Sequence, residues 1–138
     1  IMARGGKPNG ENWIIGIEKP SENYDSERNV QLKITLKDKG IVTSGNYRKY
    51  IEKDGVRYSH SIDPKTGYPV PQNLLSATVI ADNATWADCL ASICMIVGKD
   101  KALQMLEDNA DIEGYLIFVD EDGTIKTTST SGFKEYTK

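Results

Sequence analysis

The stretch LLSATVIA at residues 74–81, followed by TWADCLASICMIVG at residues 85–98, decides which fold this chain can adopt. The first is a short apolar run, which predicts a strand. The second repeats its apolar side chains with a helical period and ends at Gly98, a residue that commonly closes a helix. We therefore expect a helix layer and a sheet layer to pack together.

The residues before this stretch have the pattern of strands joined by tight turns. A strand is expected at residues 13–20. Residues 29–45 alternate apolar and polar side chains and turn at Asp38–Gly40, which predicts a hairpin. Residues 48–63 predict a second hairpin, closed by the pair Asp54–Gly55. We expect these strands to be antiparallel neighbours with one solvated face.

The residues after it add a second helix and another hairpin. Residues 99–110 are short and amphipathic, and residues 112–128 contain two apolar runs around the turn Asp122–Gly123. The expected fold class is α+β, with antiparallel β-hairpins packed with two helices. We detect no repeat or linker, so residues 1–138 are expected to form part of one domain.

Composition limits the classes of function. The chain has 138 residues, 38% hydrophobic and 27% charged, as in an ordinary globular protein. Its net charge of −3 argues against nucleic acid as a partner, because phosphate backbones attract clustered Lys and Arg. A small anionic ligand stays open if a metal or backbone amides supply the positive field. No apolar run approaches the roughly 18 residues of a membrane helix.

The cysteines do not suggest a disulfide or a metal site. Cys89 and Cys94 lie five residues apart in an expected helix. Five residues turn a helix by about 500°, so the two side chains point apart and cannot bridge. We expect both to be small buried apolar residues.

Polar side chains on the helix at 85–98 allow two interpretations. Thr85, Asp88 and Ser92 follow the spacing of one helix face. In the first interpretation Thr85 is the N-cap and Asp88 bonds back to it, as in a capping box. In the second, the Asp88 carboxylate and the Ser92 hydroxyl face a hard cation such as Mg²⁺, near a helix start that favours anions.

The stretch YSHSIDPKTGYP at residues 58–69 contains His60, the only histidine of the chain. Asp63-Pro64 and Thr66-Gly67 predict a tight, rigid turn, and a purely structural turn would account for them. Alternatively, the turn holds His60 and Asp63 at a cleft, where His60 acts as a general base.

The corner Thr43-Ser44-Gly45 also has two interpretations. A glycine after serine at the end of a strand usually marks a bulge or bend. It could instead let backbone amides approach a ligand closely.

Four motifs follow one another along the chain in one order. They are Gly5–Pro8 with Trp13–Pro20, Thr43–Tyr47, Tyr58–Pro69, and Ala87–Ser92 before a helix ending in glycine. This order and spacing resemble the ApbE-type flavin transferases, which are FAD:protein FMN transferases formerly described as thiamine-biosynthesis lipoproteins. The resemblance covers essentially the whole chain, but only about the C-terminal half of a family member.

The resemblance implies a Mg²⁺-dependent phosphoryl transfer. FAD is split at its pyrophosphate, FMN is joined to a Thr or Ser hydroxyl of a target protein, and AMP leaves. Asp88 and Ser92 correspond to metal ligands, and His60 is the candidate catalytic base. Asp63 would orient the loop as a second catalytic residue. The residues implied at the flavin are Ser44, Gly45 and His60.

The chain also departs from the family pattern. It has ADCLAS where the family usually has ADALST, although serine keeps a hydroxyl oxygen at Ser92. It begins with IMAR, as if at the end of a strand, so we expect a fragment without the N-terminal half. The alternatives are an FAD pyrophosphatase or a non-catalytic flavin-binding fragment. Exposed edge strands could form a homodimer, and the family implies a location outside the cytoplasm, through an anchor absent from this chain.

Overall fold

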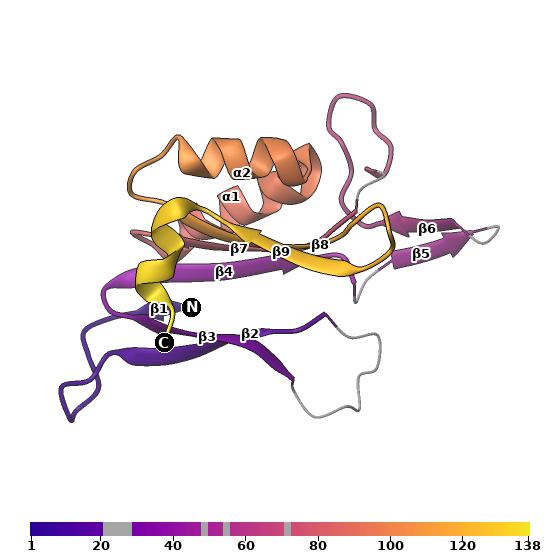
Figure 1. The fold of residues 1–138 in the computed structure, drawn as a ribbon. Coiled ribbons are helices and arrows are strands. Elements are labelled where there is room, and N and C mark those ends of the chain that lie inside the picture. The colour runs from indigo at the N-terminus through magenta and orange to yellow at the C-terminus, as the bar shows by residue number, and fades with distance from the viewer. Residues whose placement is uncertain (21–28, 48–49, 54–55, 71–72) are drawn as a thin grey trace.

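The computed structural model describes residues 1–20, 29–47, 50–53, 56–70 and 73–138, and it is an α+β fold, as the sequence predicts (Figure 1). The elements, in chain order, are β1 (Met2–Ala3), β2 (Trp13–Glu18), β3 (Val30–Leu36), β4 (Lys39–Gly45), β5 (Tyr50–Lys53), β6 (Val56–Ser59), β7 (Leu74–Ala81), α1 (Ala84–Val97), α2 (Lys99–Glu107), β8 (Glu113–Val119), β9 (Ile125–Ser129) and the 3₁₀ helix η1 (Ser131–Tyr136).

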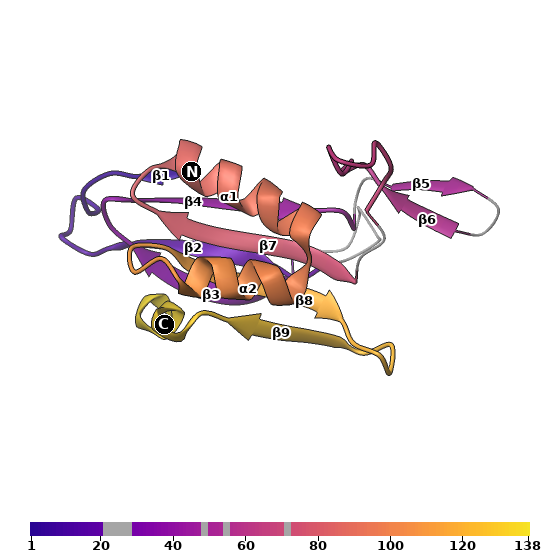
Figure 2. The same ribbon diagram turned by 90° about the horizontal axis from the view of Figure 1, so that it is seen from above.

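Three layers make up the body of the molecule. The middle layer is an antiparallel five-stranded sheet in the order β1-β4-β7-β8-β9. Helices α1 and α2 cover one face of this sheet, and the β2–β3 hairpin with η1 lies on the other (Figures 1 and 2). Within the described residues, no helix is both long and apolar enough to cross a membrane.

Strand β7 occupies the centre and is buried on both faces. Ala77, Val79 and Ala81 lie in the core beneath the helices, whereas Ile80 lies in the second core, against the β2–β3 hairpin. The expectation of one solvated face concerned the strands before residue 74 and does not apply to β7. Burying a large apolar side chain contributes about 1.5–3 kcal/mol, so a two-sided strand stabilises both cores at once.

The prediction of a hairpin at residues 29–45 is wrong. β3 pairs with β2, whereas β4 pairs with β1 and β7 in another layer. Between them Asp38 adopts a positive φ of 52°, and its carboxylate accepts a hydrogen bond from the Gly5 N–H at 2.8 Å. The chain changes layer there because Ile34 and Ile41 then enter the second core from opposite sides.

The other expected elements are confirmed, with small changes at their ends. The strand at 74–81 has the predicted bounds, and β5 pairs with β6, although Asp54–Gly55 lies outside the described residues. The closing hairpin turns at Asp122–Gly123, where the glycine has a φ of +79°. The second helix ends at Glu107, three residues earlier than expected.

Gly40 lets α1 begin directly against the sheet. A methyl group at this position would lie 2.3 Å from the Ala84 nitrogen and 2.3 Å from the Asn83 carbonyl carbon. Both are backbone atoms of the first turn of α1, so neither can move alone. The absence of a side chain at Gly40 therefore fixes how closely the helix approaches β4.

We expect Gly40→Ala to lower the free energy of unfolding by about 1–3 kcal/mol, because α1 must shift to make room. Urea denaturation measures this loss. Gly16→Ala is the matched control, since its methyl group would meet only the Val30 side chain, at 3.2 and 3.3 Å. Equal denaturation midpoints for the two variants would contradict this account of the helix–sheet contact.

Carboxylates hold η1 against the body. Glu107 accepts a hydrogen bond from the Ser131 N–H at 2.9 Å, and Glu113 accepts one from the Thr130 hydroxyl. Phe133 of η1 is buried in the second core, with its ring centroid 5.3 Å from that of Tyr115. Hydrogen bonds from the Ser131 hydroxyl and N–H keep the pKa of Glu107 below its ordinary value of 4.5.

A lowered pKa in the folded state means that Glu107 contributes stability above its unfolded-state pKa. That contribution is lost as the pH falls through the folded-state value. From about pH 6 to about pH 3, wild type should therefore lose more of its urea midpoint than Glu107→Gln. Glu135→Gln, on an exposed residue of η1, is the control and should follow wild type. A parallel decline for wild type and Glu107→Gln would rule the contribution out.

Candidate functional site

Helix α1 is capped by residues other than those of the predicted capping box. Asn83 is the N-cap, and its side-chain oxygen accepts the Trp86 N–H at 2.8 Å. Gly98 is the C-cap, as predicted, with a φ of 85°, and its N–H donates a hydrogen bond to the Cys94 carbonyl oxygen. The interpretation of Thr85 as N-cap is wrong because the cap lies two residues earlier, at Asn83, and Thr85 is already inside the helix.

Because Asn83 does the capping, Asp88 has no capping role. Asp88, Ser92 and Thr85 are all exposed. Each residue turns a helix by about 100°, so Asp88 and Ser92 project within about 40° of each other. Among the described residues no hydrogen bond or ion pair engages the Asp88 carboxylate, which leaves it free for a ligand.

The cysteines differ from each other. Cys94 is buried in the core beneath the helices, and burial raises the pKa of its thiol to about 12. Cys89 is exposed, so the expectation that both are buried is wrong for this residue. It lies on the outer surface of α1, immediately after Asp88.

The donors on α1 suit a hard cation. A carboxylate and a hydroxyl one turn apart are oxygen ligands of the kind Mg²⁺ accepts, usually with waters and substrate phosphates completing its shell. Among the described residues, no group of three or more His, Cys, Asp or Glu side chains could hold a metal. Asp88 and Ser92 supply two oxygen donors of this kind, and Mg²⁺ binding by them stays a prediction.

The segment at residues 60–70 is folded into a small antiparallel loop. The Asp63 N–H donates to the Tyr68 carbonyl at 3.0 Å, and the Gly67 N–H donates to the Asp63 carbonyl at 2.8 Å. The Asp63 carboxylate accepts the Lys65 N–H at 2.8 Å, and Gly67 has a φ of +71°. The predicted turn is thus present, and Asp63 holds its shape. His60 is exposed at its start.

Gly45 ends β4 without a bulge. It pairs with Ser76 in register, and the irregularity predicted at this corner lies instead in β7, between Leu74 and Ser76. A methyl group on Gly45 would lie 2.8 Å from the Tyr47 ring and 3.1 Å from the Leu75 carbonyl oxygen. The glycine therefore makes room for the chain's own tyrosine. Contact of Ser44 and Gly45 with a flavin stays a prediction.

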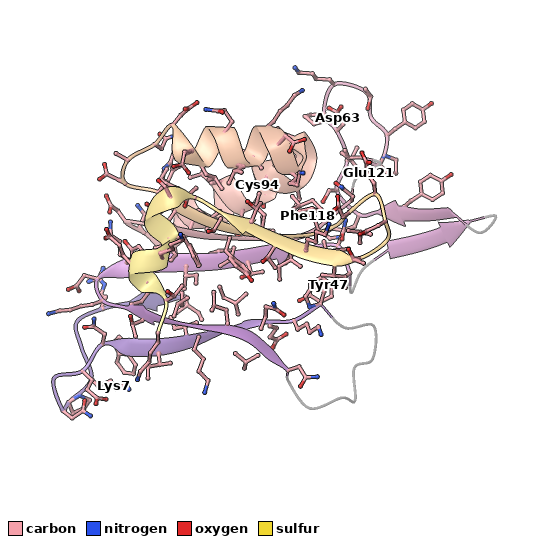
Figure 3. All side chains as sticks on the ribbon, viewed as in Figure 1. Lys7, Tyr47, Asp63, Cys94, Phe118 and Glu121 are labelled. Atoms are coloured by element: carbon pink, nitrogen blue, oxygen red, sulfur yellow. The ribbon has the colours of Figure 1, made fainter. Side chains whose placement is uncertain are left out.

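The C-terminal ends of β4 and β8 lie at the same end of the five-stranded sheet. Figure 3 shows Tyr47, Phe118 and Glu121 at this end, with Asp63 in the segment that rises beside them. The 60–70 segment stands on the helix-covered face, beyond the C-terminal end of α1 (Figures 1 and 2). Asp88 lies nearer the start of α1, so its distance along the helix axis to Val97 is roughly 14 Å. A ligand that contacts both regions must be elongated.

Sequence reasoning missed other polar contacts at this end. The Asn46 amide donates to the Leu74 carbonyl at 3.0 Å, and the Asn73 amide donates to the Val119 carbonyl at 2.8 Å. The Lys99 ammonium lies 4.6 Å from the centre of the Phe118 ring. Nothing local in the sequence signals these contacts, because each joins residues far apart in the chain.

Comparison with known proteins agrees with the architecture. The ApbE family model matches residues 1–116. The FAD:protein FMN transferase of Haemophilus influenzae is 42% identical over 138 residues, covering 100% of this chain and 39% of the relative. That of Vibrio cholerae is 40% identical over 136 residues, covering 99% of this chain and 39% of the relative.

Solved structures give the same result. The flavin transferase ApbE from Vibrio cholerae has a TM-score of 0.76 at 39% identity, covering 96% of this chain and 40% of that one. The apo flavinyl transferase ApbE of Pseudomonas stutzeri has a TM-score of 0.77 at 38% identity, covering 97% and 40%. This chain belongs to the ApbE family. It spans about two fifths of the length of the curated relatives that it matches.

Substitutions at the start of α1 test whether Asp88 has a structural role there. Asn83→Ala should lower the free energy of unfolding by about 0.5–2 kcal/mol, because the Trp86 N–H loses its acceptor. Asp88→Ala should change it by less than about 0.5 kcal/mol, since its carboxylate is exposed. Thermal or urea unfolding compares them. A larger loss for Asp88→Ala would restore the capping-box interpretation.

Proposed function

We propose that this chain is part of an enzyme that transfers FMN from FAD to a Thr or Ser hydroxyl of a target protein and releases AMP. One observation carries the proposal: relatives named FAD:protein FMN transferase resemble the whole of this chain. The exposed carboxylate of Asp88 and the hydrogen-bonded segment that begins at His60 support it.

The proposed reaction balances as a substitution at phosphorus. The acceptor hydroxyl oxygen forms a bond to the phosphorus of the FMN half of FAD. The bond from this phosphorus to the bridging oxygen breaks, and AMP leaves with that oxygen. The hydroxyl proton passes to the imidazole of His60, since histidine commonly takes up a proton near neutral pH.

In this proposal, Asp88 and Ser92 hold Mg²⁺ through one carboxylate and one hydroxyl oxygen. When bound, the ion neutralises charge on the pyrophosphate, as phosphoryl transfer requires. The chain has a net charge of −3 and supplies little positive field of its own. The negative net charge and these oxygen donors both support a dependence on metal.

The remaining predicted residues position the substrate. Asp63 fixes the turn through the Lys65 N–H and so holds His60 in place. Ser44 and Gly45 end β4 and would contact the flavin dinucleotide. By resemblance to the family, we further propose that the complete enzyme acts outside the cytoplasm, on an anchor not contained in residues 1–138. Separately, we propose that two copies of the chain dimerise by pairing their edge strands. The molar mass from light scattering tests this.

The test is an incubation of the enzyme with FAD, Mg²⁺ and an acceptor protein. We expect covalent flavin fluorescence on the acceptor and an equal amount of AMP. Asp88→Ala and EDTA should each abolish both, and His60→Gln should lower kcat by about 10²–10⁴-fold and flatten the pH profile. Asp100→Ala, an exposed carboxylate on α2, is the matched control.

Two results would refute parts of this proposal. Free FMN and AMP without labelled acceptor would identify an FAD pyrophosphatase instead. Full activity of Asp88→Ala in the presence of Mg²⁺ would remove α1 from the metal site.

A further inference from the structure

The hairpin of β5 and β6 stands apart from the three-layered body. Among the described residues its two strands pair only with each other, and the hairpin extends beyond the end of the five-stranded sheet (Figures 1 and 2). An isolated pair of strands is marginally stable, and its outer edges present backbone groups to which another strand can bond. The hairpin is therefore suited to accept a third strand.

The exposed side chains of this region lead from the hairpin to the candidate base. Tyr58, His60 and Ile62 are exposed, whereas Ser61 and Asp63 are half-buried. The chain bends at His60, between the end of β6 and the bridge at Ile62. The exposed residues Tyr58, His60 and Ile62 therefore follow one another on the stretch that leaves the hairpin.

Large apolar side chains are exposed along this segment. Tyr58 is 39% exposed and Ile62 is 46% exposed, and Tyr68 on the returning arm of the loop is 74% exposed. Ile62 forms a bridge with Pro69, and the Val70 N–H donates to the Ser61 carbonyl at 3.2 Å. The apolar groups are therefore presented by a preformed backbone, which lowers the entropy cost of binding a partner.

We propose that the acceptor polypeptide binds as an extended strand added to the edge of β6, with apolar side chains against Tyr58 and Ile62. This rests on the proposed function, in which the reacting hydroxyl must come within hydrogen-bond reach of His60. His60 directly follows the last residue of β6, so a strand paired with β6 passes beside it.

This mode of binding determines what the enzyme selects. Backbone hydrogen bonds contribute affinity for any extended segment, and pockets for alternate side chains contribute specificity. The expected partner is an extended segment of another polypeptide, with a Thr or Ser and apolar residues near it. A folded acceptor would have to present that segment as a free strand or loop.

The test uses FAD, Mg²⁺ and short synthetic peptides of random sequence around one central threonine. Wild-type enzyme should attach flavin to a subset of them. Ile62→Asp and Tyr58→Ala should each raise KM for a selected peptide about tenfold, with the change falling on this KM and not on KM for FAD. Ile125→Asp is the matched control, since its side chain is 50% exposed on β9, and it should leave both values unchanged.

Peptides methylated at one backbone nitrogen at a time provide an independent readout that needs no enzyme variant. Strand addition predicts that methylation is harmful at alternate positions only, because successive N–H groups point to opposite sides.

The outcomes separate this inference from the proposed function. Uniform tolerance of methylation, or equal effects of the Ile62 and Ile125 substitutions, would overturn strand addition. Labelling of an intact acceptor protein but of no peptide would overturn it too, while leaving the proposed function intact. An enzyme that neither cleaves FAD nor labels any acceptor would contradict the proposed function itself.

Discussion

The burial of β7 on both faces is the constraint on which the rest of the structure depends. Its odd-numbered side chains from Ala77 onward pack beneath the helices, and Ile80 packs in the core shared with the β2–β3 hairpin. Its edges are both paired, to β4 and β8. Because both faces and both edges of β7 are in contact with other elements, this one strand sets the positions of the helices, the neighbouring strands and the β2–β3 hairpin.

The position of the candidate metal ligands follows from this arrangement. α1 can settle closely on the sheet because Gly40 has no side chain to separate them. Asn83 supplies the cap, so the carboxylate of Asp88 is not used by the fold. A group that stability does not require and that remains exposed is a reasonable candidate for chemistry.

Elements whose signal is local could be predicted from the sequence. The strand at 74–81, the end of α1 at Gly98 and the turn at Asp122–Gly123 depend on short-range preferences, and all three are found. The predicted hairpin at 29–45 failed because local alternation does not say which strand pairs with which. That choice is made by the second core, where Ile34 and Ile41 meet across layers.

The candidate site was predictable as residue types, but not as a geometry. The motif around His60 and the spacing of Asp88 and Ser92 identify candidates from the sequence, whereas the packing of Tyr47 on Gly45 depends on a contact at the end of a strand. Spacing in the sequence also could not predict that Asp88 lies near the start of α1 while the 60–70 segment lies beyond its C-terminal end. This arrangement follows from where the 60–70 segment leaves the sheet.

The central claim is that Asp88 and His60 serve one FAD-binding site. Since His60 is the only histidine, its imidazole gives a single set of proton NMR signals in this chain. Paramagnetic Mn²⁺ in place of Mg²⁺, added with FAD, should broaden the His60 signals in wild type and leave them sharp in Asp88→Ala. Sharp His60 signals in wild type, with FAD and Mn²⁺ both bound, would contradict the claim.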